Sequence, residues 1–182
     1  RLEVYYGTDP SLAGDPPQPN RTFSIGAEVA LNEDPAMNFY FPVWSPEGKR
    51  VAYVGRNAIS GLTYIYVTDI EKAPGDPART VRITSDGEFH HWGAVTAWTP
   101  DGSALIFRGA DGNLVRRSPS GTGGNLGTIM LPVPWGGVQI NIHTTALPAG
   151  NRLLVRSYRD LYVYEITRAG SVVSGPTLVY RG

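Results

Sequence analysis

Apolar and polar residues alternate along most of this chain in short runs that end at turn-forming residues. The runs at 51–54, 64–69 and 161–165 are rich in valine, isoleucine, leucine and tyrosine. Because successive side chains of a strand point to opposite faces, a period of two predicts β-strands. We find no convincing helical period, and we therefore predict an all-β chain.

One short segment occurs three times and divides the sequence. The copies are Trp44-Ser45-Pro46-Glu47-Gly48, Trp98-Thr99-Pro100-Asp101-Gly102 and a weaker Ala146-Leu147-Pro148-Ala149-Gly150. Proline presets the second turn position and glycine accepts the left-handed conformation, so the first two copies predict a type I turn closed by a glycine bulge. The spacings, 98 − 44 = 54 and 147 − 98 = 49 residues, are typical of propeller repeats.

Each turn is followed by three further runs with strand character. With the strand before the turn, each repeat has four antiparallel strands, which is the composition of a propeller blade. We predict one domain over 1–182, with a half blade and lead-in at 1–40 and blades at 41–89, 90–137 and 138–182. The two tryptophans at the same repeat position, Trp44 and Trp98, are expected to pack between blades.

The N-terminal region is similar in sequence to the last two strands of the first repeat. Residues 1–9 are similar to the third strand of the first repeat, and 21–25 are similar to its fourth. The predicted total is a partial β-propeller of about 3.5 four-stranded blades, whereas closed propellers have about four to eight. Such an arc has open strand edges. Either the chain is part of a longer protein, which we favour, or another chain completes the ring, for example in a homo-oligomer.

The repeat resembles that of a known family. The segments Trp44-Ser45-Pro46-Glu47-Gly48, Tyr64-Ile65-Tyr66-Val67-Thr68-Asp69 and Arg82-Ile83-Thr84 are similar to the TolB-like propeller repeat, also called the WD40-like or PD40 repeat. The resemblance extends over 42–84, and less closely over 96–118 and 143–182. It implies a propeller located in the periplasm, at the cell surface or outside the cell. The motif residues of that family build the blade, so no functional residue is carried over from them.

Composition argues against several classes of function and site. Sixteen basic and sixteen acidic residues cancel, which argues against nucleic-acid binding, because such binding depends on neutralising phosphates. No apolar run reaches eighteen residues, so we predict no membrane span. The chain has no cysteine, which excludes disulfides and thiolate metal sites. We predict no cofactor.

The candidate ligand-binding residues are Tyr40, His90, His91, Trp92 and His143. The repeat alignment sets His143 against Tyr40, so both are expected to face the central channel at one depth. Histidines at a channel mouth could bind zinc, but adjacent strand residues point to opposite faces. We therefore favour packing or solvent exposure over a metal site.

Motifs of catalysis are missing from the sequence. It has no Gly-x-Ser-x-Gly elbow, no His-Glu-x-x-His and no phosphate-binding glycine loop. Our first hypothesis is a non-catalytic protein-binding or scaffold module, whose loops or open edges bind a protein partner or further blades from another chain. The alternatives are the substrate-gating propeller of a longer prolyl oligopeptidase-type peptidase, and a glycan-binding module.

Overall fold

The computed structural model describes residues 2–4, 29–32, 34–88, 96–121, 124–131, 140–147, 150–157 and 160–181. Within these residues the regular secondary structure is entirely strand, which confirms the all-β prediction. The strands are β1 (Leu2–Val4), β2 (Val29–Asn32), β3 (Met37–Trp44), β4 (Arg50–Asn57), β5 (Thr63–Asp69), β6 (Thr80–Arg82), β7 (Ala97–Trp98), β8 (Leu105–Arg108), β9 (Leu114–Arg117), β10 (Asn125–Ile129), β11 (Ile140–Leu147), β12 (Gly150–Ser157), β13 (Asp160–Ile166) and β14 (Val172–Tyr180).

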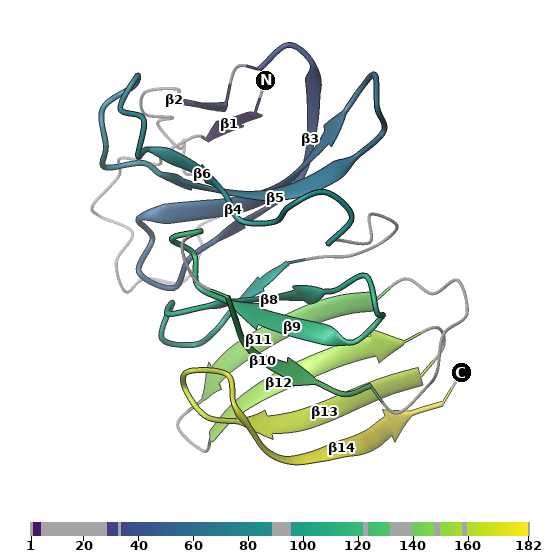
Figure 1. Ribbon diagram of the computed structural model, residues 1–182. Helices are drawn as coiled ribbons and strands as arrows, with labels where there is room; N and C mark the ends of the chain where they lie inside the picture. The colour runs from purple at the N-terminus through teal and green to yellow at the C-terminus, as the bar shows by residue number, and fades with distance from the viewer. Residues whose placement is uncertain are drawn as a thin grey trace, which may run out of the picture.

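Twelve of these strands form three antiparallel sheets, each of four strands in chain order. The first sheet is β3-β4-β5-β6, the second is β7-β8-β9-β10 and the third is β11-β12-β13-β14. Figure 1 shows the three sheets one after another, with the first at the top and the third at the bottom. Each predicted repeat from the first tryptophan onward therefore corresponds to one four-stranded sheet.

Two apolar layers fill the spaces between the sheets. One side of β4 and β5 packs against the second sheet in a cluster of Ala52, Val54, Ile65, Val67, Ile83, Trp98, Leu105, Phe107 and Val115. The opposite face of the second sheet packs against the third in a cluster of Ala97, Ile106, Leu114, Ile129, Leu153, Val155, Tyr162, Tyr164 and Ile166. Alternate residues of β8 enter different layers, so both faces of this strand are buried.

The predicted turns are confirmed in the first two sheets. The Gly48 amide donates to the Ser45 carbonyl at 2.9 Å, and the Gly102 amide donates to the Thr99 carbonyl at 2.8 Å. Both glycines have the expected positive φ, 73° and 71°. The hydroxyls of Ser45 and Thr99 accept hydrogen bonds from backbone amides five residues further on, each at 3.0 Å. The side chain at the first position therefore fixes the return of the chain.

A further turn of this kind was missed by the sequence analysis. It lies between β13 and β14, where the Gly170 amide donates to the Thr167 carbonyl at 2.9 Å. The Thr167 hydroxyl also accepts from the Ser171 amide at 3.0 Å. This turn has the hydroxyl and the glycine but no proline. In the predicted third copy, Leu147 pairs with Gly150, and the two residues between them lie outside the described part of the chain.

The N-terminal pairing differs from the prediction in its partner. Among the described residues, β1 pairs with β2 in an antiparallel two-stranded sheet. We predicted a strand within residues 1–9, where β1 lies, but expected residues 21–25 to be its partner. Residues 27–41, which include β2, were treated as a lead-in to the first full blade. Residues 21–25 lie outside the described part. The strand at 29–32 has polar and apolar residues in a very short run, which is why its pattern was not distinctive.

Candidate functional site

Trp98 lies at the junction of the first and second sheets. Its side chain is 3% exposed, and its indole N–H donates to the Val43 carbonyl of the first sheet at 3.1 Å. The Arg50 guanidinium lies over the ring, 4.8 Å from its centroid. The prediction that Trp98 packs between sheets is therefore confirmed, and the partners that hold it come from the preceding sheet.

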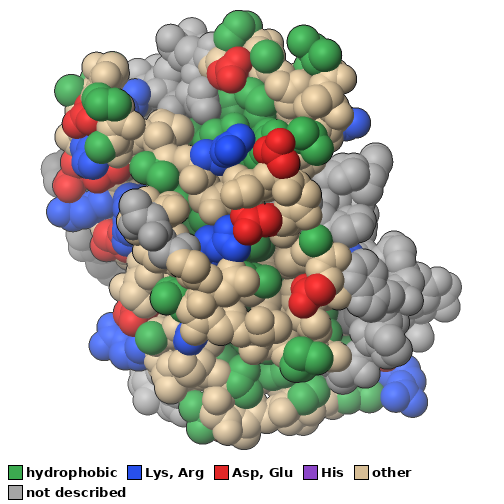
Figure 2. All heavy atoms as spheres, viewed as in Figure 1, with side chains coloured by type: hydrophobic (Ala, Val, Ile, Leu, Met, Phe, Trp, Pro, Cys, Tyr) green, Lys and Arg blue, Asp and Glu red, His purple; other side chains and the backbone are tan. Residues whose placement is uncertain are grey.

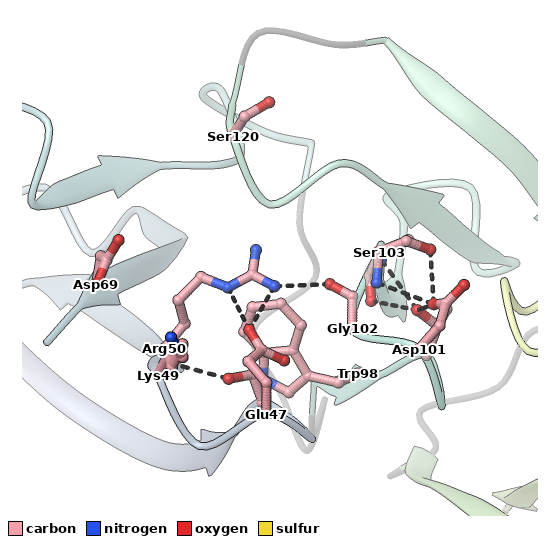
Figure 3. Close-up of polar contacts among 12 residues, drawn as sticks. Glu47, Lys49, Arg50, Asp69, Trp98, Asp101, Gly102, Ser103 and Ser120 are labelled. Atoms are coloured by element: carbon pink, nitrogen blue, oxygen red, sulfur yellow. Dashed lines mark hydrogen bonds and ion pairs between the residues drawn. The ribbon is translucent and has the colours of Figure 1, made fainter. Parts of the chain in front are cut away.

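Arg50 connects the turns of these two sheets (Figure 3). It donates to the Glu47 carboxylate at 2.7 Å and to the Gly102 carbonyl at 2.9 Å. Partial burial raises the pKa of Glu47, but hydrogen bonds from its own backbone and from Arg50 outweigh this effect, so the pKa lies below its usual value. The charged pair thus stays ionised and fixes the guanidinium against the ring of Trp98.

A cleft of about 600 Å³ opens beside this junction. Its charged lining residues are Arg50, Asp69, Lys72, Arg79 and Asp101. Figure 3 shows Asp69 and Ser120 across the opening from the turn that contains Gly102 and Ser103. Figure 2 shows basic and acidic side chains next to each other on the side of the molecule that it presents, with hydrophobic side chains between them.

The charged groups of the cleft are bonded into its walls. The Lys72 ammonium donates to the Ala78 carbonyl at 3.0 Å. Partial burial raises the pKa of Asp101, but hydrogen bonds from Ser103 and Thr99 outweigh this and lower it. Lys72 and Asp101 thus hold fixed positions in the walls of the cleft.

The wall that the first sheet contributes to this cleft has a regular pattern across three strands. Arg50 on β4 pairs in register with Asp69 on β5, and Val67 on β5 pairs with Val81 on β6. All four residues line the cleft. Into this wall the second sheet inserts its turn, with Gly102 as the acceptor for Arg50.

The outward face of the third sheet repeats this wall. A hollow of about 270 Å³ is lined by Arg152, Val163, Glu165, Ser174, Thr177 and Val179. Arg152 pairs in register with Glu165, and Val163 with Thr177. Arg152 follows its turn glycine by two residues, as Arg50 does. In the part of the chain that the structure describes, no turn of another sheet occupies this second wall.

The prediction for Trp44 is wrong. Its side chain is 44% exposed, although it has the same repeat position as the buried Trp98. Trp98 rests on a preceding four-stranded sheet, whereas the strands described before β3 are the short β1 and β2. The repeat specifies the side chain, but burial depends on a neighbouring sheet.

Two more aromatic side chains accompany Trp44 on β3. Tyr40 is 43% exposed and Phe41 is 49% exposed, with their ring centroids 6.1 Å apart. The ladder between β3 and β4 shifts between Tyr40 and Val43, and Phe41 has a φ of 56°, a conformation that bulky residues rarely adopt. Bulges of this kind re-aim side chains, and here the Phe41 ring is turned to solvent. These three residues form what we call the β3 aromatic surface.

The structure describes only some of the predicted site residues. Tyr40 belongs to the β3 aromatic surface. His143 lies on β11, in register with Leu154, and its side chain is not among those described. His90, His91 and Trp92 lie outside the described residues. The predicted common depth of Tyr40 and His143 in a central channel therefore stays a prediction.

A partly buried ion pair holds the segment that precedes those residues. Arg117 on β9 donates to both oxygens of Glu88, at 2.8 and 3.3 Å, and to the Asn125 side-chain oxygen at 2.6 Å. It also donates to the Ile83 carbonyl at 3.1 Å and lies over the Phe107 ring. Hydrogen bonds from Arg117 and from the Ser85 amide lower the pKa of Glu88 to about 2. We call this group the Arg117 clamp.

The described residues include neither a metal-binding cluster nor a membrane-spanning helix. No three or more histidine, cysteine, aspartate or glutamate side chains lie close enough together there to bind a metal ion. In the same part of the chain, no helix has the length and apolar character that crossing a membrane requires.

The comparisons with known proteins identify a structural similarity but no family. Neither a protein-family model nor a curated protein matches the chain. Among solved structures, the chain is similar to a protein from Lactobacillus plantarum whose crystal structure was determined by the Northeast Structural Genomics Consortium. The TM-score is 0.41 and the sequence identity 15%, over 90% of this chain and 48% of that one. This chain therefore spans about half the length of that protein.

Proposed function

We propose that this chain is an arc of a TolB-like propeller, of about 3.5 blades, that acts as a non-catalytic protein-binding or scaffold module. The arrangement of the sheets supports the propeller. β3 lies beside β7, and β7 lies beside β11, so the first strands of successive sheets are neighbours. Blades of a propeller gather their first strands in this way around a central axis.

The observation that carries the binding function is the outer edge of the third sheet. Among the described strands β14 pairs with β13 alone, and all nine of its residues are exposed. Its large apolar side chains, Val172, Val173, Leu178, Val179 and Tyr180, are exposed as well. In Figure 2, hydrophobic side chains reach the surface in the lower part of the view, where the third sheet lies. An open edge offers backbone N–H and C=O groups to an added strand.

A peptide selection tests this function. The immobilised chain is exposed to a displayed library of random peptides, and the enriched peptides are then tested against a Val173→Lys, Tyr180→Lys variant. We expect extended, apolar peptides that lose binding to the variant, because lysines on an edge oppose strand addition. Ile59→Lys is the control, since Ile59 is a highly exposed apolar residue in a loop, remote in sequence from β14. Peptides that bind all three proteins equally, or no enrichment at all, contradict the proposal.

The β3 aromatic surface favours the glycan-binding alternative, since aromatic rings are common contact groups at binding sites. Saturable quenching of tryptophan fluorescence by a soluble sugar, lost in a Tyr40→Ala variant, is the result that this alternative predicts. We also propose that the chain works in the periplasm, at the cell surface or outside the cell, as the resemblance implies. Fractionation of the source cells tests this location.

A further inference from the structure

We infer that the cleft between the first and second sheets binds a small zwitterion, namely an α-amino acid with a large apolar side chain. The α-carboxylate lies against Arg50 and Lys72, and the α-ammonium lies against Asp69. The site is separate from the β14 edge, so the inference goes beyond the proposed protein-binding function. It rests on two opposite charges that lie on neighbouring strands, line one cleft and are not paired with each other.

Arg50 supplies a hydrogen-bond donor whose position is already fixed. Its Nε donates to the Glu47 carboxylate at 2.7 Å, and its Nη2 donates to the Gly102 carbonyl at 2.9 Å. The guanidinium also lies 4.8 Å from the centroid of the Trp98 ring. Among the described residues, the remaining nitrogen, Nη1, has no hydrogen-bond partner. Figure 3 shows it directed away from Glu47, into the opening below Ser120. A donor that is already ordered costs little further entropy when a ligand binds.

Asp69 places a negative charge beside this donor. It pairs in register with Arg50 on the adjacent strand, and residues directly opposite each other have Cβ atoms about 5 Å apart. The two side chains form no ion pair, because the Arg50 guanidinium is turned toward Glu47. One Asp69 oxygen accepts from the Glu71 amide at 3.0 Å, and the carboxylate is directed toward the same opening in Figure 3. Its other oxygen has no partner within the described part of the chain, so it is available to a cationic group.

The other charged residues make the Arg50 side of the cleft basic. Lys72 and Arg79 line the cleft together with Arg50. The Lys72 ammonium uses one proton on a backbone carbonyl, and since an ammonium has three donors, it can also donate to a carboxylate. Asp101, the second acidic residue of the lining, accepts from the Ser103 hydroxyl on the opposite wall. An anionic group is therefore attracted to the Arg50 side, and Asp69 is left to accept from a cationic group.

The spacing of the charges and the apolar lining define the class of ligand. The ammonium and the carboxylate of an α-amino acid are attached to the same carbon, which suits two charges on directly opposite strand residues. Asp69 would repel a simple anion, and the three basic residues would repel a simple cation. Val67 and Val81 line the cleft from the first sheet and Pro119 lines it from the second. The volume of about 600 Å³ is typical of small-molecule sites and leaves room for a large apolar side chain.

The third sheet provides an internal comparison. Arg152 and Glu165 form a similar register pair on neighbouring strands, and with Val163 they line the hollow of about 270 Å³. Within the described residues, no other sheet lines that hollow, so it lacks a second wall. Glu165 also accepts from the Ser174 hydroxyl at 3.1 Å. We therefore expect no binding there, and Glu165 is a matched control for Asp69.

Calorimetric titration of the full chain with L-leucine tests the inference. We expect saturable binding of leucine at one site. N-acetyl-leucine lacks the ammonium and leucinamide lacks the carboxylate, so each should bind at least about tenfold more weakly, as expected for the loss of one charged hydrogen bond. The absence of saturable leucine binding overturns the inference. Equal binding of leucine and either derivative also overturns it, because the site would then not recognise both charges.

Substitutions place the binding in the cleft. Asp69→Asn and Lys72→Ala should each weaken leucine binding at least about tenfold, whereas Glu165→Gln should leave it unchanged. Asparagine keeps an acceptor for the Glu71 amide, and the melting temperature of each variant shows whether it folds. If Asp69→Asn does not fold, Lys72→Ala and the two leucine derivatives decide. Equal effects of Asp69→Asn and Glu165→Gln contradict the assignment to this cleft. The peptide selection at β14 is independent of these results, so the two proposals can fail separately.

Discussion

Replacing Glu88 by glutamine should expose the energetic contribution of the Arg117 clamp. The Arg117 side chain is 10% exposed, and Glu88 is its carboxylate partner among the described residues, at 2.8 Å. Glutamine keeps the size of the side chain and one acceptor but removes the charge. Arg117 is then left with the Asn125 and Ile83 oxygens. A partly buried guanidinium that loses its counter-charge destabilises the folded state.

The magnitude follows from the pKa of the carboxyl group. Folding lowers the pKa of Glu88 from 4.5 to about 2, which at about 1.4 kcal/mol per pH unit corresponds to ~3 kcal/mol. The Glu88 side chain is 39% exposed, so solvent screening reduces the expected contribution to about 1–2 kcal/mol. Because the pKa is lowered in the folded state, this contribution is present above pH 4.5 and is lost as the pH falls toward 2.

The assay is urea denaturation of the wild-type chain and of Glu88→Gln, near neutral pH and in steps between pH 4.5 and 2. We expect the variant to be less stable at neutral pH by the amount above, and the difference to disappear toward the acidic end. Asp86→Asn is the control, because its contact with Arg82 is long, 3.8 Å, and both side chains are well exposed. A difference that does not change with pH, or an equal effect of the control, would refute the reasoning.

Two further substitution pairs test the packing between sheets. Trp98→Ala should lower the free energy of unfolding by about 3–5 kcal/mol, because the ring is fully enclosed. Trp44→Ala should lower it by about 0.5 kcal/mol in the monomer, as for most exposed positions. Thermal and urea melts compare the two variants, and equal losses would contradict the difference in burial. Gly102→Ala should be more destabilising than Gly48→Ala, which should cost about 1 kcal/mol for its left-handed conformation alone. A Cβ at Gly102 would lie 2.5 Å from the Glu47 carboxylate, whereas nothing lies within 4 Å at Gly48. Similar losses at both glycines would show that Glu47 moves aside without cost.

The local parts of this structure were predictable from sequence because they depend on neighbouring residues. The turns at Ser45–Gly48 and Thr99–Gly102 are fixed by proline, glycine and a hydroxyl, and each sheet consists of strands adjacent in the chain. The alternating runs at 51–54, 64–69 and 161–165 lie within β4, β5 and β13. The missed turn at 167–170 shows that the hydroxyl and the glycine are sufficient without the proline.

The candidate site was less predictable, because its geometry depends on which sheets lie next to each other. Trp44 and Trp98 are indistinguishable in the repeat, yet only Trp98 has a four-stranded sheet in front of it among the described residues. The contact of Arg50 with Gly102 spans 52 positions in the chain, and no local pattern encodes it. One signal was available: an arginine two residues after the turn glycine occurs at Arg50 and Arg152 but not after Gly102.

The chain-order pairing within each sheet also bears on how the protein folds. Every hairpin in the three sheets joins strands that are consecutive in sequence, so each sheet can form by closing short loops, which are the fast steps of β-sheet formation. Long-range steps are confined to docking one finished sheet on another. During synthesis the sheets can therefore form in order from the N-terminus, whereas the contact of Trp98 with the Val43 carbonyl requires both the first and the second sheet.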